Sequence, residues 1–144
     1  MDGIRSVSPH QGPLRKAILG FKYGRQRDLA PVLASLLADY LILNPLPADL
    51  LVPVPLHPNR QRQRGYNQSI LLARALAGAL PHAGLAVNEA TLRRIRATAS
   101  QTKLDRHQRK QNVAGAFACT DGTLARQRVL LIDDVCTTGA TLEA

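Results

Sequence analysis

The chain has 144 residues, a common length for one domain, and 45% of its residues are apolar. Its apolar stretches end before the roughly 18 residues that a membrane-spanning helix needs, and residues 1–9 lack the apolar stretch of a signal peptide. We therefore expect a single-domain cytoplasmic protein with no membrane span. Its two cysteines, Cys119 and Cys136, have no partners at metal-ligand spacing, which argues against a zinc site and a disulfide framework.

Charge is the strongest compositional signal, because 19 lysines and arginines outnumber 10 acidic residues and give a net charge of +9. Many of the basic residues are clustered in Arg60, Arg62 and Arg64, and in Arg93, Arg94, Arg96, Lys103, Arg106, Arg109 and Lys110. Such clusters are typical of a solvated face or of a surface that binds a phosphorylated molecule or nucleic acid. A platform for stacking bases is not indicated, since the chain has only 3 tyrosines, 2 phenylalanines and no tryptophan.

Apolar residues that recur with the 3.6-residue period predict helices over residues 14–24, 28–41 and 70–80. In the second of these, Asp28 is placed to cap the helix and Pro31 is tolerable in the first turn. In the third, leucines at positions 72, 76 and 80 stack on one face. These helices are expected to pack mainly against the core.

Short apolar runs predict strands between the helices. The expected strands cover residues 50–54, 91–95, 113–119 and 129–132. Pro53 and Pro55 remove donors from the first strand, so its regular pairing should end near 52–54 and the prolines should stiffen an exit loop toward 60–65. Residues 97–111 have weak periodicity and are expected to form a mobile basic loop. Strands that alternate with helices indicate an α/β fold with a parallel sheet flanked by helices.

The segment 129–144 combines a strand, two adjacent acids and a small-residue loop. Residues 129–132 are all apolar, as in a strand covered on both faces, and Asp133 and Asp134 follow at its carboxyl end, where open α/β sheets bind ligands. The loop 136–141 has no bulky side chain, so its N–H groups and threonine hydroxyls can surround a phosphate at the start of a helix. A strand, turn and helix with a solvated acidic pair is the simpler alternative, but the order of the features favours a sugar-phosphate site.

This segment resembles the signature of the type I phosphoribosyltransferases, in which an apolar strand, two acids and a loop ending Thr-Gly-x-Thr bind phosphoribosyl pyrophosphate. The matching residues are Asp133, Asp134, Thr137, Thr138, Gly139 and Thr141. Other segments are similar to the ComF/GntX branch of this family, which is associated with DNA uptake in transformable bacteria. They are residues 14–41, 52–57, 60–73, 94–98 and 101–117, so the resemblance covers about residues 12–144.

The resemblance implies a type I phosphoribosyltransferase-like fold and a reaction in which a nitrogen nucleophile attacks C1 of the ribose while pyrophosphate leaves with Mg²⁺. Asp133 and Asp134 would hold the ribose hydroxyls. The 5-phosphate loop would consist of Val135, Cys136, Thr137, Thr138, Gly139, Ala140 and Thr141. Pyrophosphate would bind to Arg60 and Arg64, and the basic segment would close over it with Lys103, Arg106 and Arg109. Fixed cations at the leaving group lower the barrier, and Mg²⁺ would be held mainly by substrate oxygens and water rather than by direct protein ligands.

The chain departs from the family's pattern in three places. Thr137 stands where purine-salvage relatives have an aspartate base, and a hydroxyl cannot take that proton at neutral pH, so a purine-salvage reaction is disfavoured. The family's N-terminal four-cysteine ribbon has no counterpart here. In the family another strand and helix follow the position of Ala144, so we expect a domain that is incomplete at its C-terminal end and keeps an uncovered sheet edge or face.

Two other functions are left open by the sequence. One is a binding protein of this kind that senses phosphoribosyl pyrophosphate or binds single-stranded DNA, and strong, steeply salt-dependent DNA binding without pyrophosphate release would favour it. A fragment without activity is the third reading. The expected partners are phosphoribosyl pyrophosphate with Mg²⁺, and single-stranded DNA and a second copy of the chain, as a homodimer, are further candidates.

Overall fold

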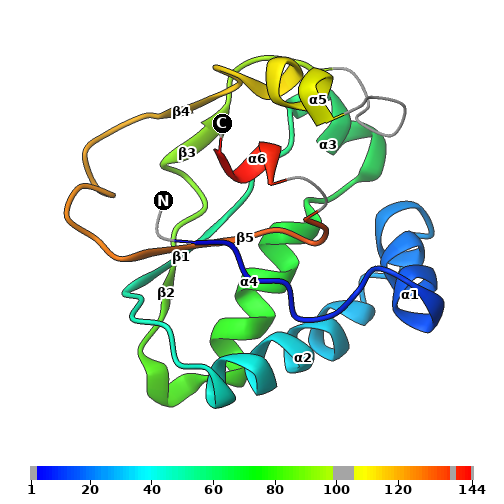
Figure 1. Cartoon of the computed structure of the whole chain (residues 1–144), viewed down its shortest axis with the longest axis vertical. Helices are drawn as coiled ribbons and strands as arrows, with labels where there is room; N and C mark the ends of the chain where they lie inside the picture. The colour runs from blue at the N-terminus through cyan, green and yellow to red at the C-terminus, as the bar shows by residue number, and fades with distance from the viewer. Residues whose placement is uncertain (1–2, 99–105, 137–138, 144) are drawn as a thin grey trace.

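The computed structural model describes residues 3–98, 106–136 and 139–143 and has helices and strands that alternate along the chain (Figure 1). Its helices are α1 (Gly12–Tyr23), α2 (Leu29–Leu43), α3 (Pro58–Arg64), α4 (Gln68–Ala79), the short 3₁₀ helix η1 (Pro81–Ala83), α5 (Arg106–Val113) and α6 (Ala140–Glu143). Its strands are β1 (Leu50–Pro53), β2 (Ala86–Val87), β3 (Leu92–Arg94), β4 (Phe117–Cys119) and β5 (Val129–Ile132). No helix in these parts of the chain has the length and apolar character needed to cross a membrane.

Three parallel strands form the main sheet, in the order β2-β1-β5. Leu50 pairs with Val129 and Pro53 pairs with Ile132, so β1 and β5 end side by side. Proline is tolerated in the central strand because Pro53 is its last residue, and the next N–H, of Val54, donates to Ile132 O at 2.9 Å. The α/β class with a parallel sheet flanked by helices is confirmed, and it is consistent with a phosphoribosyltransferase-like fold.

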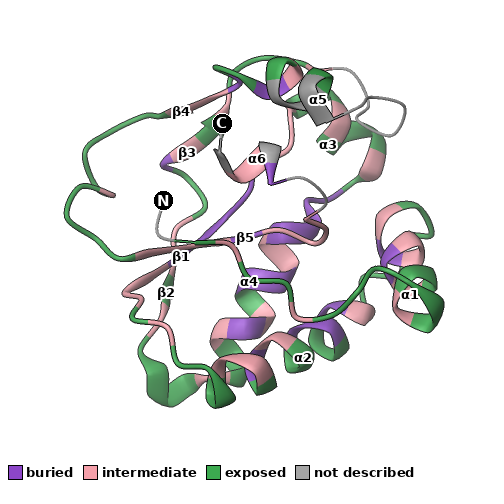
Figure 2. Cartoon of the chain, viewed as in Figure 1, coloured by how far each residue is buried: buried purple, intermediate pink, exposed green. Residues whose placement is uncertain are grey.

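The core lies where α4 packs between the main sheet and α2. Leu72 is 3% exposed and Leu76 is 0% exposed, as expected for leucines that stack on the buried face of a helix. Figure 2 shows that buried residues concentrate on α4, on the facing side of α2 and along β1. Leu51 and Val52 point to opposite faces of the sheet and both are fully buried, so both faces of β1 are covered.

The three helices predicted from periodicity correspond to α1, α2 and α4, with ends shifted by one to two residues. The expected capping role of Asp28 is wrong: Asp28 occupies the N-cap position of α2, but its side chain makes no cap hydrogen bond. Its backbone is in the helical region, with φ of −65° and ψ of −11°, rather than in the extended conformation that directs a cap side chain toward the first turn.

The exit from β1 differs from the expected loop, because residues 58–64 form helix α3. Pro58 is tolerated in the first turn of a helix, and His57 caps this end by accepting a hydrogen bond from Asn59 N at Nδ1. Gly65 ends α3 with φ of +81°, a left-handed conformation that favours glycine. Apolar periodicity could not predict this helix of 7 residues, because none of its side chains is buried.

The mobile loop expected over 97–111 is wrong in its second half, because residues 106–113 form helix α5; residues 99–105 lie outside the described residues. Periodicity missed α5 because Val113 is its only apolar residue. The strand expected over 113–119 is shorter than predicted: Val113 ends α5, Gly115 turns the chain with φ of +62°, and only residues 117–119 form β4. Val113 and Ala116, two of the apolar residues that suggested a longer strand, are fully buried outside β4.

Strands β3 and β4 form a separate antiparallel pair and do not join the main sheet. Leu92 pairs with Cys119 and Arg94 pairs with Phe117. The Arg96 guanidinium donates from Nη2 to Asn112 O at 3.1 Å and to Ala114 O at 2.6 Å, and so ties the end of α5 to the end of β3. Arg93 and Arg94 of the second basic cluster lie on β3 of this two-stranded arm, and Arg106, Arg109 and Lys110 lie on α5 (Figure 1).

Candidate functional site

The carboxyl ends of β1 and β5 bring the two predicted halves of the site together. Because the two strands are parallel and in register up to Pro53 and Ile132, the segments that follow them leave the sheet at the same edge. The segment after β5 begins with the acidic pair, Asp133 and Asp134. The segment after β1 leads into α3 and then into α4, and it carries the first basic cluster.

Asp133 is held by two hydrogen bonds. Its Oδ1 accepts from Ser69 Oγ at 3.3 Å, at the start of α4, and from its neighbour's backbone, Asp134 N, at 2.9 Å. Burial raises the pKa of the Asp133 carboxyl from 3.8 to about 7, and the negative charge of Asp134 adds to this effect. The hydrogen bonds from Asp134 N and Ser69 and the charge of Lys22 act in the opposite direction and lower that pKa. Asp133 therefore changes its charge near neutral pH.

Asp134 pairs with a cation from the first helix. Lys22 Nζ, at the end of α1, lies 3.0 Å from Asp134 Oδ1, and the two side chains are 20% and 8% exposed. Of the two adjacent acids, one is thus neutralised by a lysine and the other is partly neutralised by a proton. Both can exchange these partners for the hydroxyls of a ligand.

A basic cavity of about 340 Å³ lies on the other side of Lys22. It is lined by Lys22, Tyr23, Arg25, Arg60, Gln63 and Arg64. The predicted pyrophosphate residues Arg60 and Arg64 therefore line one cavity, and none of the described acidic residues lines it with them. The Arg64 guanidinium is oriented by Gln68, whose Oε1 accepts from Nη1 at 2.9 Å, and by the Tyr23 ring, whose centroid lies 5.0 Å from Cζ. Lys22 is paired with Asp134, but three arginines remain in the lining, and this excess of positive charge favours an anionic ligand.

Arg94 on β3 adds a half-buried cation to this region. Its guanidinium lies 5.2 Å from the centroid of the Phe117 ring and donates from Nη2 to Thr98 Oγ1, whereas its buried Nε has no hydrogen-bond partner within the described parts of the chain. Burial lowers the pKa of Arg94, and the charge of Arg60 lowers it further, while the charge of Asp133 raises it. Arg60 Nη2 donates to the same residue, at Thr98 O, 3.4 Å away. Arg93 and Arg96 are exposed, as expected for basic residues on a solvated face, whereas Arg94 is not.

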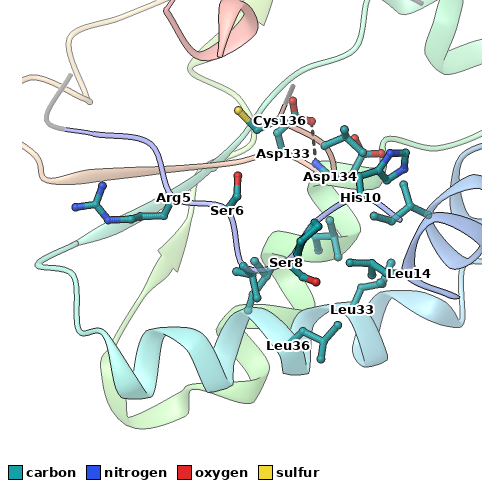
Figure 3. Close-up of a pocket in the computed structure, with 16 residues that line it drawn as sticks. Arg5, Ser6, Ser8, His10, Leu14, Leu33, Leu36, Asp133, Asp134 and Cys136 are labelled. Carbon is teal, nitrogen blue, oxygen red and sulfur yellow. Dashed lines mark hydrogen bonds between the residues drawn. The ribbon is translucent and has the colours of Figure 1, made fainter. Parts of the chain in front are cut away.

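A second cavity, of about 430 Å³, is lined by both acids of the pair (Figure 3). Asp133, Asp134 and Cys136 form one wall, and the facing wall is apolar and includes Leu33 and Leu36 of α2. Residues 5–10 cross this space and close it on a third side. The ion pair of Asp134 with Lys22 therefore joins an apolar cavity to the basic one.

The 5-phosphate loop is described in part. Val135 and Cys136 are half-buried beside the acidic pair, and Gly139 is buried with φ of +74°, a conformation that favours glycine. Ala140 and Thr141 begin α6, and Leu142 N donates to Gly139 O at 2.8 Å. Thr137 and Thr138 lie outside the described residues.

The basic segment predicted to close over pyrophosphate is likewise described in part. Lys103 lies outside the described residues, and Arg106 and Arg109 lie on α5, which packs beside α6.

Three residues of the site were not predicted: Lys22, Ser69 and the half-buried Arg94. Their sequence signals are weak, because a lysine at a helix end, a serine in a first helical turn and an arginine in a strand are common in any soluble protein.

Curated proteins similar to this chain are named for DNA use and competence. A "DNA utilization protein YhgH" of Salmonella typhi is 37% identical over 143 residues, which are 95% of this chain and 61% of that protein. "Competence protein F" of Haemophilus influenzae is 36% identical over 137 residues, covering 90% of this chain and 58% of that protein. "Competence protein ComFC" of Bacillus subtilis is 27% identical over 139 residues, 96% of this chain and 54% of that protein.

These similarities support the resemblance to the ComF family. The chain spans about 61% of the length of the first of these relatives. No family model matches the chain, and no solved structure matches it.

Proposed function

We propose that this chain is the phosphoribosyl-pyrophosphate-binding part of a ComF-family protein and that, with Mg²⁺, it transfers the phosphoribosyl group to a nitrogen acceptor. One observation carries the proposal: the parallel pairing of β1 with β5 sets a pair of acids beside a basic cavity at one edge of the sheet. A pyrophosphorylated ribose has the complementary chemistry, since its hydroxyls donate hydrogen bonds to carboxylates and its pyrophosphate attracts guanidinium groups. The names of the relatives add an association with competence and DNA use.

In the proposed reaction the lone pair of the acceptor nitrogen forms a bond to C1 of the ribose. The bond from C1 to the pyrophosphate oxygen breaks, its electrons leave with pyrophosphate, and the acceptor nitrogen loses its proton to solvent. Asp133 and Asp134 would orient the ribose through its 2- and 3-hydroxyls. Arg60 and Arg64 would neutralise the charge that grows on the leaving group, and Arg94 would add to them from β3. Lys103, Arg106 and Arg109 stay candidates for closing over the pyrophosphate.

The donor set suits Mg²⁺ only with help from the substrate. Asp133 and Asp134 supply carboxylate oxygens of the kind that Mg²⁺ binds, and within the described residues no cluster of three or more acidic, histidine or cysteine side chains could hold a metal ion by itself. Substrate oxygens and water would complete the coordination. When bound, the ion would neutralise part of the charge on pyrophosphate.

Isothermal titration calorimetry with phosphoribosyl pyrophosphate and Mg²⁺ tests the binding step. We expect saturable heat with the unaltered chain and an affinity at least about tenfold lower for Asp134→Asn, because a charged acceptor of ribose hydroxyls is lost. Asp39→Asn is the matched control, since Asp39 is an exposed acid on α2. A folded chain that gives no heat with the donor at millimolar concentration would contradict the proposal.

A pyrophosphate-release assay tests the transfer step. Ammonium chloride serves as the smallest nitrogen nucleophile, and the expected result is release that depends on ammonium, on Mg²⁺ and on Asp134. Saturable donor binding without release, under conditions where the donor is stable, would instead favour a sensor of phosphoribosyl pyrophosphate.

Binding of single-stranded DNA is the second candidate function. It is favoured by the exposed arginines Arg62, Arg93 and Arg96 around the site and by the names of the relatives. Titration of a labelled oligonucleotide at several salt concentrations tests it, because an affinity that comes from phosphate contacts falls steeply with salt. If Asp134→Asn abolishes donor binding and leaves DNA binding unchanged, the chain has two separate sites.

A further inference from the structure

Lys22 is held in an unusual position for a lysine. Its side chain is only 20% exposed, and its ammonium group lies 3.0 Å from a carboxylate that is 8% exposed. Removing both groups from water opposes this arrangement, and holding a lysine side chain in one conformation has an entropic cost as well. An ion pair of this kind is therefore weak evidence for a contribution to stability, and a role in binding is the better explanation.

The backbone at Lys22 is fixed to the same helix start that holds Asp133. Tyr66 Oη donates to Phe21 O, and Gln68 Nε2 donates to Lys22 O at 3.4 Å. Carbonyl groups in the last turn of a helix have no partner within the helix, so these two side chains satisfy the end of α1. Tyr66 is 7% exposed and Gln68 is 1% exposed, which makes the anchor rigid. Next along the chain is Ser69, the hydrogen-bond donor to Asp133.

The ammonium group of Lys22 thus borders both halves of the donor site. On one side it contacts Asp134, which belongs to the wall of the apolar cavity, and on the other it lines the basic cavity with Arg60 and Arg64. A lysine ammonium has three donors on a flexible four-carbon stem, so it can exchange one partner for another without movement of the backbone. A ribose that takes hydrogen bonds from Asp134 would release part of this contact.

We infer that Lys22 is a donor-binding residue that couples the two halves of the donor site. In the free chain it pairs with Asp134, and in the complex it turns toward the pyrophosphate group while the ribose hydroxyls take its place on the carboxylate. This inference rests on the proposed function. It assigns to α1, which precedes the main sheet in the chain, a direct part in recognising the donor's pyrophosphate.

Three ligands in calorimetric titrations with Mg²⁺ separate this role from a structural one: phosphoribosyl pyrophosphate, inorganic pyrophosphate and ribose 5-phosphate. For Lys22→Met we expect an affinity about tenfold lower for the first two ligands, since a charge-assisted contact is lost. The affinity for ribose 5-phosphate should change by less than about threefold, because that ligand has no pyrophosphate. Lys22→Arg should restore part of the pyrophosphate affinity, and Lys16→Met, at an exposed lysine of the same helix, should change none of the three.

Each outcome decides between the two proposals. If the unaltered chain does not bind phosphoribosyl pyrophosphate, the proposed function fails, and the inference fails with it. If it binds and Lys22→Met binds equally well, only the inference fails. An equal loss of all three ligands in Lys22→Met, with or without a loss of helical circular dichroism, would show a structural role for Lys22 and would also overturn the inference.

Discussion

Ser69 Oγ donates a hydrogen bond to Asp133 Oδ1 at 3.3 Å, across 64 positions of the sequence. Ser69 is 4% exposed and lies in the first turn of α4, where Asn67 caps the helix by accepting from Ser69 N at 2.9 Å. Asn67 also donates to Val54 O at 3.0 Å and so connects the same turn to the exit of β1. The hydroxyl that supports the first acid of the site is therefore positioned by the strand and helix that carry the basic half.

The Ser69→Ala substitution should raise the pKa of Asp133 further. The hydroxyl stabilises the charged carboxylate and lowers its pKa, and alanine offers no donor in its place. Carbon-detected NMR titration of the Asp133 carboxyl measures the change. Ser35→Ala removes an exposed serine of α2 that donates to its own helix, at Val32 O, and should have no effect. A Ser69→Ala titration curve identical to that of the unaltered chain would contradict the assigned role.

The affinity for phosphoribosyl pyrophosphate should rise between pH 6 and pH 8. The charged form of Asp133 accepts hydrogen bonds from ribose hydroxyls more strongly than the protonated form, and with a pKa of about 7 the charged form increases from roughly a tenth to roughly nine tenths of the molecules. We expect an increase of up to about tenfold beyond that seen with inorganic pyrophosphate, whose binding does not use Asp133. Calorimetry at fixed Mg²⁺ measures both ligands, and equal pH dependence of the two would contradict the prediction.

Asp133→Asn should change how stability depends on pH. The folded pKa of about 7 lies above the unfolded value of 3.8, so between these values the native state holds a proton that the unfolded state has lost. Stability from this group is present at low pH and is lost as pH rises toward 7. Relative to the unaltered chain, the variant should therefore gain about 2 to 3 kcal/mol of unfolding free energy on going from pH 5 to pH 8.

Urea unfolding of both proteins at the two pH values measures this difference. Asparagine keeps an oxygen that can accept from Ser69 and from the backbone, so the fold of the variant should be retained. Asp39→Asn, at an exposed acid, is the control and should leave the pH dependence as it is. Parallel stability curves for the unaltered chain and Asp133→Asn would show that Asp133 titrates normally.

Arg94→Met should weaken anion binding without a matching loss of stability. Arg94 is half-buried, its Nε has no partner among the described residues and Arg60 repels it, so a methionine here removes a desolvated charge. We expect the unfolding free energy to change by less than about 1 kcal/mol, because the lost contact with the Phe117 ring offsets part of the gain. The affinity for inorganic pyrophosphate with Mg²⁺ should fall about tenfold.

The matched control for this substitution is Arg93→Met on the same strand. Arg93 is exposed, so its loss should leave pyrophosphate affinity within about twofold. Urea unfolding and calorimetry of both variants make the comparison. Equal effects of the two substitutions on pyrophosphate affinity would show that general surface charge, rather than a site at Arg94, attracts the anion.

Local sequence determined the elements whose apolar residues follow a clear period. Amphipathic spacing and short apolar runs depend only on neighbouring residues. They therefore predicted the α/β class, the helices over residues 14–24, 28–41 and 70–80, and the strand at 129–132. The acidic pair was likewise visible, since its position at a strand end depends only on its neighbours in the chain. Helices α3 and α5 could not be predicted in this way, because α3 has no buried side chain and α5 has a single apolar residue.

Only the tertiary structure decided how the site is assembled. The β1–β5 pairing joins segments about 80 residues apart, and no local pattern records that register. The same holds for Lys22 against Asp134, for Ser69 against Asp133 and for the burial that raises the pKa of Asp133. A sequence states which groups a chain possesses, whereas distances and desolvation arise from packing between distant segments. The charge state of this acidic pair is therefore a property of the fold.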